Sequence, residues 1–313
     1  MRTERVGRAF AAIALVCGMS AVATSAPAFS PFSHLLGKPK AQPAATGGGS
    51  AAIADQVRQA LDEKRYVDAS DLLAKAKIQN ISSPRLTVLT GELMLGRGQI
   101  ADARTTFHSM LGDPVERPSA LEGEGLALSL MGKSDEALAD LKQATVLDKS
   151  QWRAWNGLGR EYDMRKDWKQ ATAAYAQAMA APGANMAIVL NNRGYSHLLQ
   201  KQNDLAIADF VAALDKDPGL AAARTNLRIT MAIEGRYDRA SVTGVGDDRA
   251  AVLNNVGLAA AIRGDYDKAS KLLNAAIDAK GKYYERATDN LELTKQLQAR
   301  AQDVPTMTDA AIR

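Results

Sequence analysis

The sequence is poor in the residues that build redox and metal sites. Its 313 residues include one cysteine, Cys17, and three histidines, and only 5% of the residues are aromatic. A single cysteine excludes an internal disulfide framework and a metal site made of several cysteine ligands. Because His34, His108 and His197 lie far apart and in no metal-ligand spacing, we expect them to be surface or helix-packing side chains.

The sequence also lacks the charge pattern of a nucleic-acid-binding protein. The net charge is +4, and residues 1–28 contribute +2 of it. Binding to phosphates needs clustered Lys and Arg with stacking aromatics, and no such cluster is present. No glycine motif has the spacing of a phosphate loop, and the carboxylate pairs Asp247-Asp248 and Glu122/Glu124 have the pattern of solvated charges. We therefore predict no nucleic-acid partner, no cofactor, no metal and no enzyme activity.

The first 28 residues have the pattern of a secretory signal peptide. Three arginines precede an apolar run, Ala9–Met19, that is long enough for a signal sequence and too short to span a bilayer. Small residues allow cleavage after Ala23 or, as we prefer, after Ala28. Prolines and a glycine run then predict an unstructured linker over residues 29–50.

Cys17 offers a second processing route, because bacterial lipoproteins carry a lipid on a cysteine that follows the apolar run. The preceding residues fit that signal poorly, since β-branched Val16 occupies the place of a small residue. We expect a periplasmic protein, with an outer-membrane lipoprotein as the alternative. Contact with a membrane is expected only through such a lipid anchor.

A repeat runs through the rest of the chain. Seven alanines that follow charged or turn-like stretches are separated by 34, 34, 34, 35, 34 and 29 residues. They are Ala69, Ala103, Ala137, Ala171, Ala206, Ala240 and Ala269. A glycine lies twelve residues before most of them, and a bulky apolar residue lies four residues after most of them. This spacing predicts helix pairs in which each glycine lets two helices cross closely and the bulky residue fills the space beside it.

The 34-residue unit resembles the tetratricopeptide repeat, a helix-turn-helix motif. One unit matches the pattern of that family nearly throughout, with Trp155, Leu158, Gly159, Tyr162, Ala171, Tyr175 and Ala178. The resemblance implies an all-α fold, a solenoid of about seven units over residues 51–283. The sixth unit is abbreviated, because Ser241–Asp248 replaces its bulky residues, and we expect this to kink the array or open a gap. A capping helix over residues 284–303 and a flexible tail over 304–313 complete the prediction.

Stacked helix pairs present a concave surface formed by the first helix of each pair, and this surface binds peptides. Ten residues are expected to line it: Arg153, Asn156, Arg160, Asn191, Asn192, Tyr195, Thr225, Asn226, Asn254 and Asn255. An asparagine amide can pair with any peptide backbone, and the two arginines suit a partner carboxylate. The alternative is that the asparagines serve packing between units.

The chain further resembles the TadD family, the tetratricopeptide component of tight-adherence (Flp) pilus systems. The resemblance depends on the export signal and on the units that begin at Leu190 and Leu253. It implies an exported scaffold for pilus or secretion-system assembly that binds a secretin or another assembly protein. A general periplasmic scaffold or adaptor, and a regulatory subunit of an envelope enzyme, are the alternatives.

Overall fold

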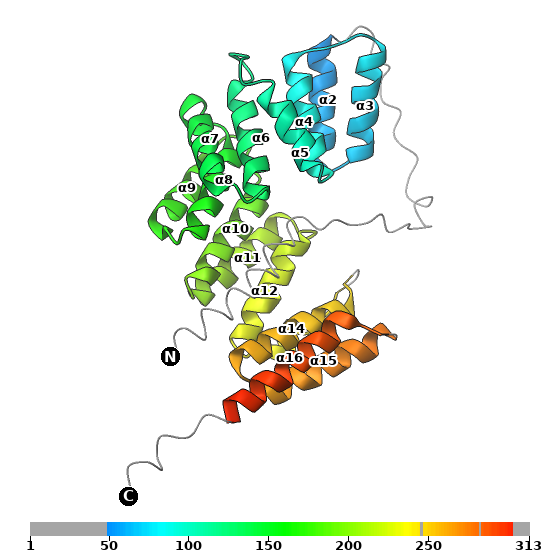
Figure 1. The fold of residues 1–313 in the computed structure, drawn as a ribbon, viewed down its shortest axis with the longest axis vertical. Helices are drawn as coiled ribbons and strands as arrows, with labels where there is room; N and C mark the ends of the chain where they lie inside the picture. Colours follow the sequence, from blue (N-terminus) through cyan, green and yellow to red (C-terminus); the bar gives the residue numbers. More distant parts are fainter. Residues whose placement is uncertain (1–48, 245–246, 282, 303–313) are drawn as a thin grey trace, which may run out of the picture. The chain divides into compact units, whose positions relative to one another are not determined.

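The computed structural model describes residues 49–302 apart from residues 245, 246 and 282 (Figure 1). Within these ranges the regular secondary structure is α-helical, and no strand occurs. No helix in the same ranges is long and apolar enough to cross a membrane. The expected signal peptide with Cys17, residues 29–48 of the expected linker and the expected tail lie outside the described residues.

The helices follow one another in pairs, and the chain forms two compact units (Figure 1). The pairs of the N-terminal unit, described over residues 49–185, are α2 (Ser50–Asp62) with α3 (Tyr66–Ile78), α4 (Pro84–Gly96) with α5 (Ile100–His108), α6 (Arg117–Leu130) with α7 (Ser134–Leu147), and α8 (Trp152–Met164) with α9 (Trp168–Ala180).

The C-terminal unit is described from residue 186 to residue 302. Its pairs are α10 (Met186–Leu199) with α11 (Asn203–Lys216), α12 (Ala221–Ile233) with α13 (Tyr237–Ala240), and α14 (Arg249–Arg263) with α15 (Tyr266–Lys280), followed by α16 (Glu285–Gln302). In both units we call α2, α4, α6, α8, α10, α12 and α14 the first helices.

The turn inside each pair has the same backbone conformation. One residue between the first and second helix has a positive φ, which lets the first helix end and the chain reverse. These residues are Lys64, Gly98, Gly132, Lys166, Lys201, Gly235 and Gly264. Their spacing follows the predicted repeat, so the turns confirm its period.

The predicted contact of glycine with a bulky residue is present in five pairs. A Cβ atom added to the glycine would lie 2.6–2.8 Å from the side chain sixteen residues later, which is closer than real Cβ contacts. The partners are Gly91 with Phe107, Gly125 with Leu141, Gly159 with Tyr175, Gly194 with Phe210 and Gly257 with Leu273. All five bulky side chains are fully buried. The core of each pair therefore forms where the glycine permits close approach.

The sixth pair is abbreviated as predicted, since its second helix, α13, has only four residues. Ala232 of α12 shares one apolar cluster with Val252 and Val256 of α14. No gap therefore separates α12 from α14. Arg228 of α12 contacts Asp247 just before α14, with Nη2 2.6 Å from Oδ2.

Helix α16 packs on the last pair, α14 and α15, which confirms a C-terminal helix after the repeats (Figure 1). It buries Ala287 and Thr294 and leaves most of its other side chains at least partly exposed. Covering the apolar edge of the last repeat is the general requirement for a stable array of repeats.

Candidate functional site

The ten predicted surface residues all lie on first helices. Three of them are on α8 in the N-terminal unit, and seven are on α10, α12 and α14 in the C-terminal unit. Their positions on these helices follow directly from the repeat. Their burial divides them into two groups, which the sequence does not distinguish.

The first group consists of four buried asparagines, Asn156, Asn191, Asn226 and Asn254, of which Asn191 and Asn226 bond to each other. Asn191 of α10 and Asn226 of α12 are 9% and 7% exposed. Asn226 Nδ2 donates a hydrogen bond of 3.0 Å to Asn191 Oδ1, and Asn191 Nδ2 donates to Asn192 Oδ1 at 3.1 Å. A buried amide needs such partners, because an unsatisfied polar group in the interior is costly.

The same arrangement recurs at the end of the C-terminal unit. Asn290 of α16 donates a hydrogen bond of 2.8 Å to Asn254 Oδ1, and Asn254 Nδ2 donates to Asn255 Oδ1 at 3.2 Å. Asn254 is 1% exposed. The carboxamides therefore connect successive helices of the stack, which is the packing role that the sequence analysis left open. That any of these asparagines binds a partner stays a prediction.

The second group is half-buried and reaches the surface. It comprises Arg153, Arg160, Asn192, Tyr195, Thr225 and Asn255. Tyr195 packs its ring against a cluster that contains Leu198 and Phe210, so part of this side chain supports the fold. These six residues are the part of the predicted surface that is accessible to another chain.

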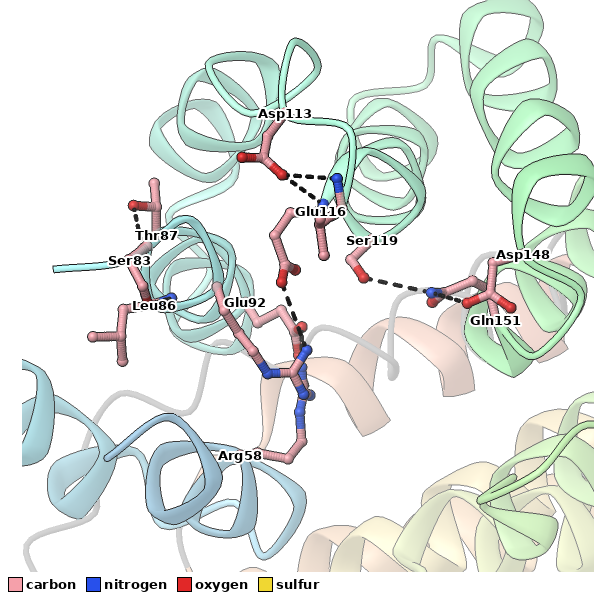
Figure 2. Close-up of polar contacts among 12 residues, drawn as sticks. Arg58, Ser83, Leu86, Thr87, Glu92, Asp113, Glu116, Ser119, Asp148 and Gln151 are labelled. Atoms are coloured by element: carbon pink, nitrogen blue, oxygen red, sulfur yellow. Dashed lines mark hydrogen bonds and ion pairs between the residues drawn. The ribbon is translucent and has the colours of Figure 1, made fainter. Parts of the chain in front are cut away.

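In the N-terminal unit, ion pairs connect the first helices. Arg58 of α2 forms two hydrogen bonds of 2.5 Å to the carboxylate of Glu92 on α4. Figure 2 shows the two side chains between these helices. Arg153 of α8 reaches Asp62 at the end of α2, with Nη2 2.9 Å from Oδ1. The sequence analysis did not find these pairs.

Glu122 and Glu124 correct one sequence expectation, because neither is solvated. They are 5% and 3% exposed. Helix α6 packs against α4, α5, α7 and α8, so its polar side chains are covered on several sides. The Glu124 carboxylate lies 3.1 Å from His108 Nδ1 and 3.4 Å from Arg104 Nε. The His108 side chain is 66% exposed, so His108 is a surface residue that contacts α6, in line with the expectation of surface or helix-packing histidines.

Glu122 caps a neighbouring helix. Its Oε2 accepts a hydrogen bond of 3.0 Å from the backbone N–H of Ala154 in the first turn of α8. Gln151 precedes α8 but gives it no side-chain cap; its amide reaches Asp148 at 2.9 Å and Ser119 at 3.4 Å (Figure 2). Burial raises the pKa of Glu122 to about 7, although Arg153 opposes the shift.

The described residues give two observations on metal and ligand sites. Among them, no group of three or more His, Cys, Asp or Glu side chains is placed to hold a metal ion. An open pocket of about 380 Å³ lies beside the start of α15 and is lined by 264–268 and Gln298. None of the ten predicted residues lines this pocket.

Comparison with known proteins agrees with this geometry. A tetratricopeptide-repeat family model matches residues 123–185 and 161–221. Together with the paired helices, the regular turns and the glycine contacts, the match defines the class: the chain folds as a tetratricopeptide-repeat solenoid. Such proteins are typically scaffolds that bind other proteins, and no catalytic family is indicated.

Individual proteins resemble this chain in sequence or in fold. Over 149 residues the chain is 27% identical to the heat-shock protein cognate co-chaperone sgt12 of Aspergillus fumigatus, and the match covers 44% of this chain and 43% of sgt12. The solved Cut9–Hcn1 complex is similar at a TM-score of 0.57 and 18% identity, covering 81% of this chain and 50% of that chain. The type IV pilus biogenesis factor PilW is similar at a TM-score of 0.53 and 19% identity, covering 66% of this chain and 98% of PilW. The chain thus spans half or less of sgt12 and of the matched Cut9–Hcn1 chain.

Proposed function

We propose that this protein is an exported scaffold that binds a protein partner through its first helices during assembly of a Flp/Tad pilus or secretion system. The observation that carries the binding role is the set of half-buried polar side chains on α8, α10, α12 and α14. Repeat proteins of this class bind peptides on the face formed by such helices.

Charge and hydrogen-bonding capacity suggest the kind of partner. Arg153 and Arg160 of α8 suit a carboxylate, either an acidic side chain or a chain end. Tyr195 and Asn255 in the C-terminal unit offer an aromatic surface and an amide. An acidic segment of a secretin or of another assembly protein fits this chemistry.

The assignment to pilus assembly depends on two resemblances. The export signal and the units that begin at Leu190 and Leu253 resemble the TadD family, and PilW, a pilus biogenesis factor, shares the fold over nearly its whole length. A general periplasmic scaffold or adaptor is the second candidate, because the match to sgt12 is a match to a co-chaperone.

Crosslinking in cells, purification from the envelope fraction and mass spectrometry test the proposal. The native protein is compared with a triple variant, Arg160→Ala, Tyr195→Ala and Asn255→Ala, and with the control Gln177→Ala on the exposed side of α9. We expect secretin or pilus components with the native protein and the control, and loss of these proteins with the triple variant. Recovery of cytosolic proteins alone would contradict the export on which the proposal depends.

Localisation has its own test. Fractionation of cells that produce the native protein or Cys17→Ser separates the two processing routes. We propose that both proteins are released with the periplasm. Membrane association that Cys17→Ser abolishes would establish the lipoprotein alternative instead.

A further inference from the structure

The ion pair between Arg153 and Asp62 connects two helices that are distant in the sequence. Arg153 lies in the first turn of α8, and Asp62 is the last residue of α2, 91 residues earlier. These are the first helices of the fourth and first pairs of the N-terminal unit. The pair therefore spans this unit from its first repeat to its last.

The neighbours of Arg153 hold it in this position. Its guanidinium lies 5.0 Å from the centre of the Trp152 ring, and the buried carboxylate of Glu122 attracts it electrostatically. On the other side, Arg58 lies one turn before Asp62, with Nη1 3.8 Å from Oδ1. Asp62 thus lies between two guanidinium groups.

We propose that the Arg153–Asp62 pair is an autoinhibitory latch, in which Asp62 occupies the place of a partner's carboxylate on Arg153. The inference rests on the proposed function and specifies its regulation. A partner's carboxylate competes with Asp62 for the guanidinium of Arg153, whose side chain stays 32% exposed. Opening the latch frees α2 from α8, while Arg58 keeps its bonds to Glu92.

The exposure of the pair sets the strength of the latch. The side chains of Arg153 and Asp62 are 32% and 52% exposed, so water and salt screen their attraction. Pairs of this kind change an equilibrium by about twofold to fivefold. The latch therefore opens reversibly and modulates affinity instead of blocking the surface completely.

The first test is hydrogen exchange of the full-length protein with no ligand. Asp62→Ala is compared with Asp55→Ala, a matched change on the exposed side of the same helix, for which no ion pair is found among the described residues. We expect Asp62→Ala and Arg153→Gln to speed exchange at the end of α2 and in the first turn of α8. Asp55→Ala should leave both segments unchanged. Unchanged exchange in Asp62→Ala would overturn the latch, whatever the protein binds.

The second test measures binding of a fluorescein-labelled hexaglutamate peptide at low and physiological salt. We expect Asp62→Ala to bind it about twofold to fivefold more tightly than the native protein or Asp55→Ala. The double variant Asp62→Ala/Arg153→Gln should lose this gain. Equal affinity of all four proteins for the peptide, or no binding by any of them, would show that the Arg153–Asp62 pair does not cover a carboxylate-binding site. The envelope crosslinking experiment is independent, so a partner recovered there would leave the scaffold function intact while the latch fails.

Discussion

Glu122→Gln tests how the N-terminal unit accommodates a buried carboxyl group. The glutamine keeps the shape and the oxygen that accepts the N–H of Ala154, but it carries no charge at any pH. Burial raises the pKa of Glu122 from 4.5 to about 7 in the folded protein. The folded state therefore favours the protonated acid. The contribution of protonated Glu122 to the free energy of unfolding is complete below pH 4.5 and is lost as the pH rises through 7.

The size of the effect follows from the shift in pKa. One pKa unit corresponds to about 1.4 kcal/mol, so a shift from 4.5 to about 7 corresponds to about 3 kcal/mol. We expect the native protein and Glu122→Gln to have similar free energies of unfolding near pH 5. At pH 8.5 the variant should be the more stable protein by up to about 3 kcal/mol.

Urea denaturation followed by circular dichroism at pH 5, 7 and 8.5 measures the difference. Glu136→Gln on α7 is the matched control, since the side chain of Glu136 is 53% exposed and pairs with Lys133. Its stability should follow that of the native protein within about 0.5 kcal/mol at each pH. If the free energies of unfolding of Glu122→Gln and the native protein changed in parallel with pH, the raised pKa of Glu122 would be refuted. A variant that is less stable than the native protein at pH 8.5 would refute the predicted direction of the effect.

Two further predictions concern packing inside the repeats. Gly159→Ala places a methyl group 2.6 Å from the buried ring of Tyr175. We expect a net loss of about 0.5–2 kcal/mol in the free energy of unfolding, after the better helix propensity of alanine is included. Unchanged or increased stability in thermal denaturation would count against the close contact. Asn226→Ala removes the donor to the buried Asn191 Oδ1, so it should lower the free energy of unfolding in urea by about 1–2 kcal/mol. Asn274→Ala, on the exposed side of α15, is the control and should change the free energy of unfolding by less than about 0.5 kcal/mol. Equal effects of the two asparagine variants would contradict the packing role.

The repeat made most of the fold predictable from the sequence. Gly159 and Tyr175 occupy fixed places in a 34-residue period, and local helix geometry alone determines that they meet. The abbreviated sixth pair was visible for the same reason, because Ser241–Asp248 lacks the bulky residues of the other units. Periodic local contacts are the information that a single sequence carries most directly.

Contacts between distant repeats were not predictable in this way. The approach of Arg153 to Asp62 depends on how four helix pairs stack, and small rotations in each pair add up over 91 residues. The burial of Glu122 could have been predicted from the repeat. Glu122 lies three residues before Gly125, just as Asn156 lies three residues before Gly159. Glu122 therefore occupies the position that a buried asparagine has in another unit.

Site-specific photocrosslinking in cells tests the central claim that the first helices bind the partner. A photoreactive amino acid is placed at Arg160 or Asn255 on first helices, or at Gln177 or Asn274 on the exposed side of second helices. The account predicts that one envelope protein is captured from Arg160 and Asn255 and that the second-helix positions give no adduct with it. Capture from Gln177 and Asn274 alone would contradict the account.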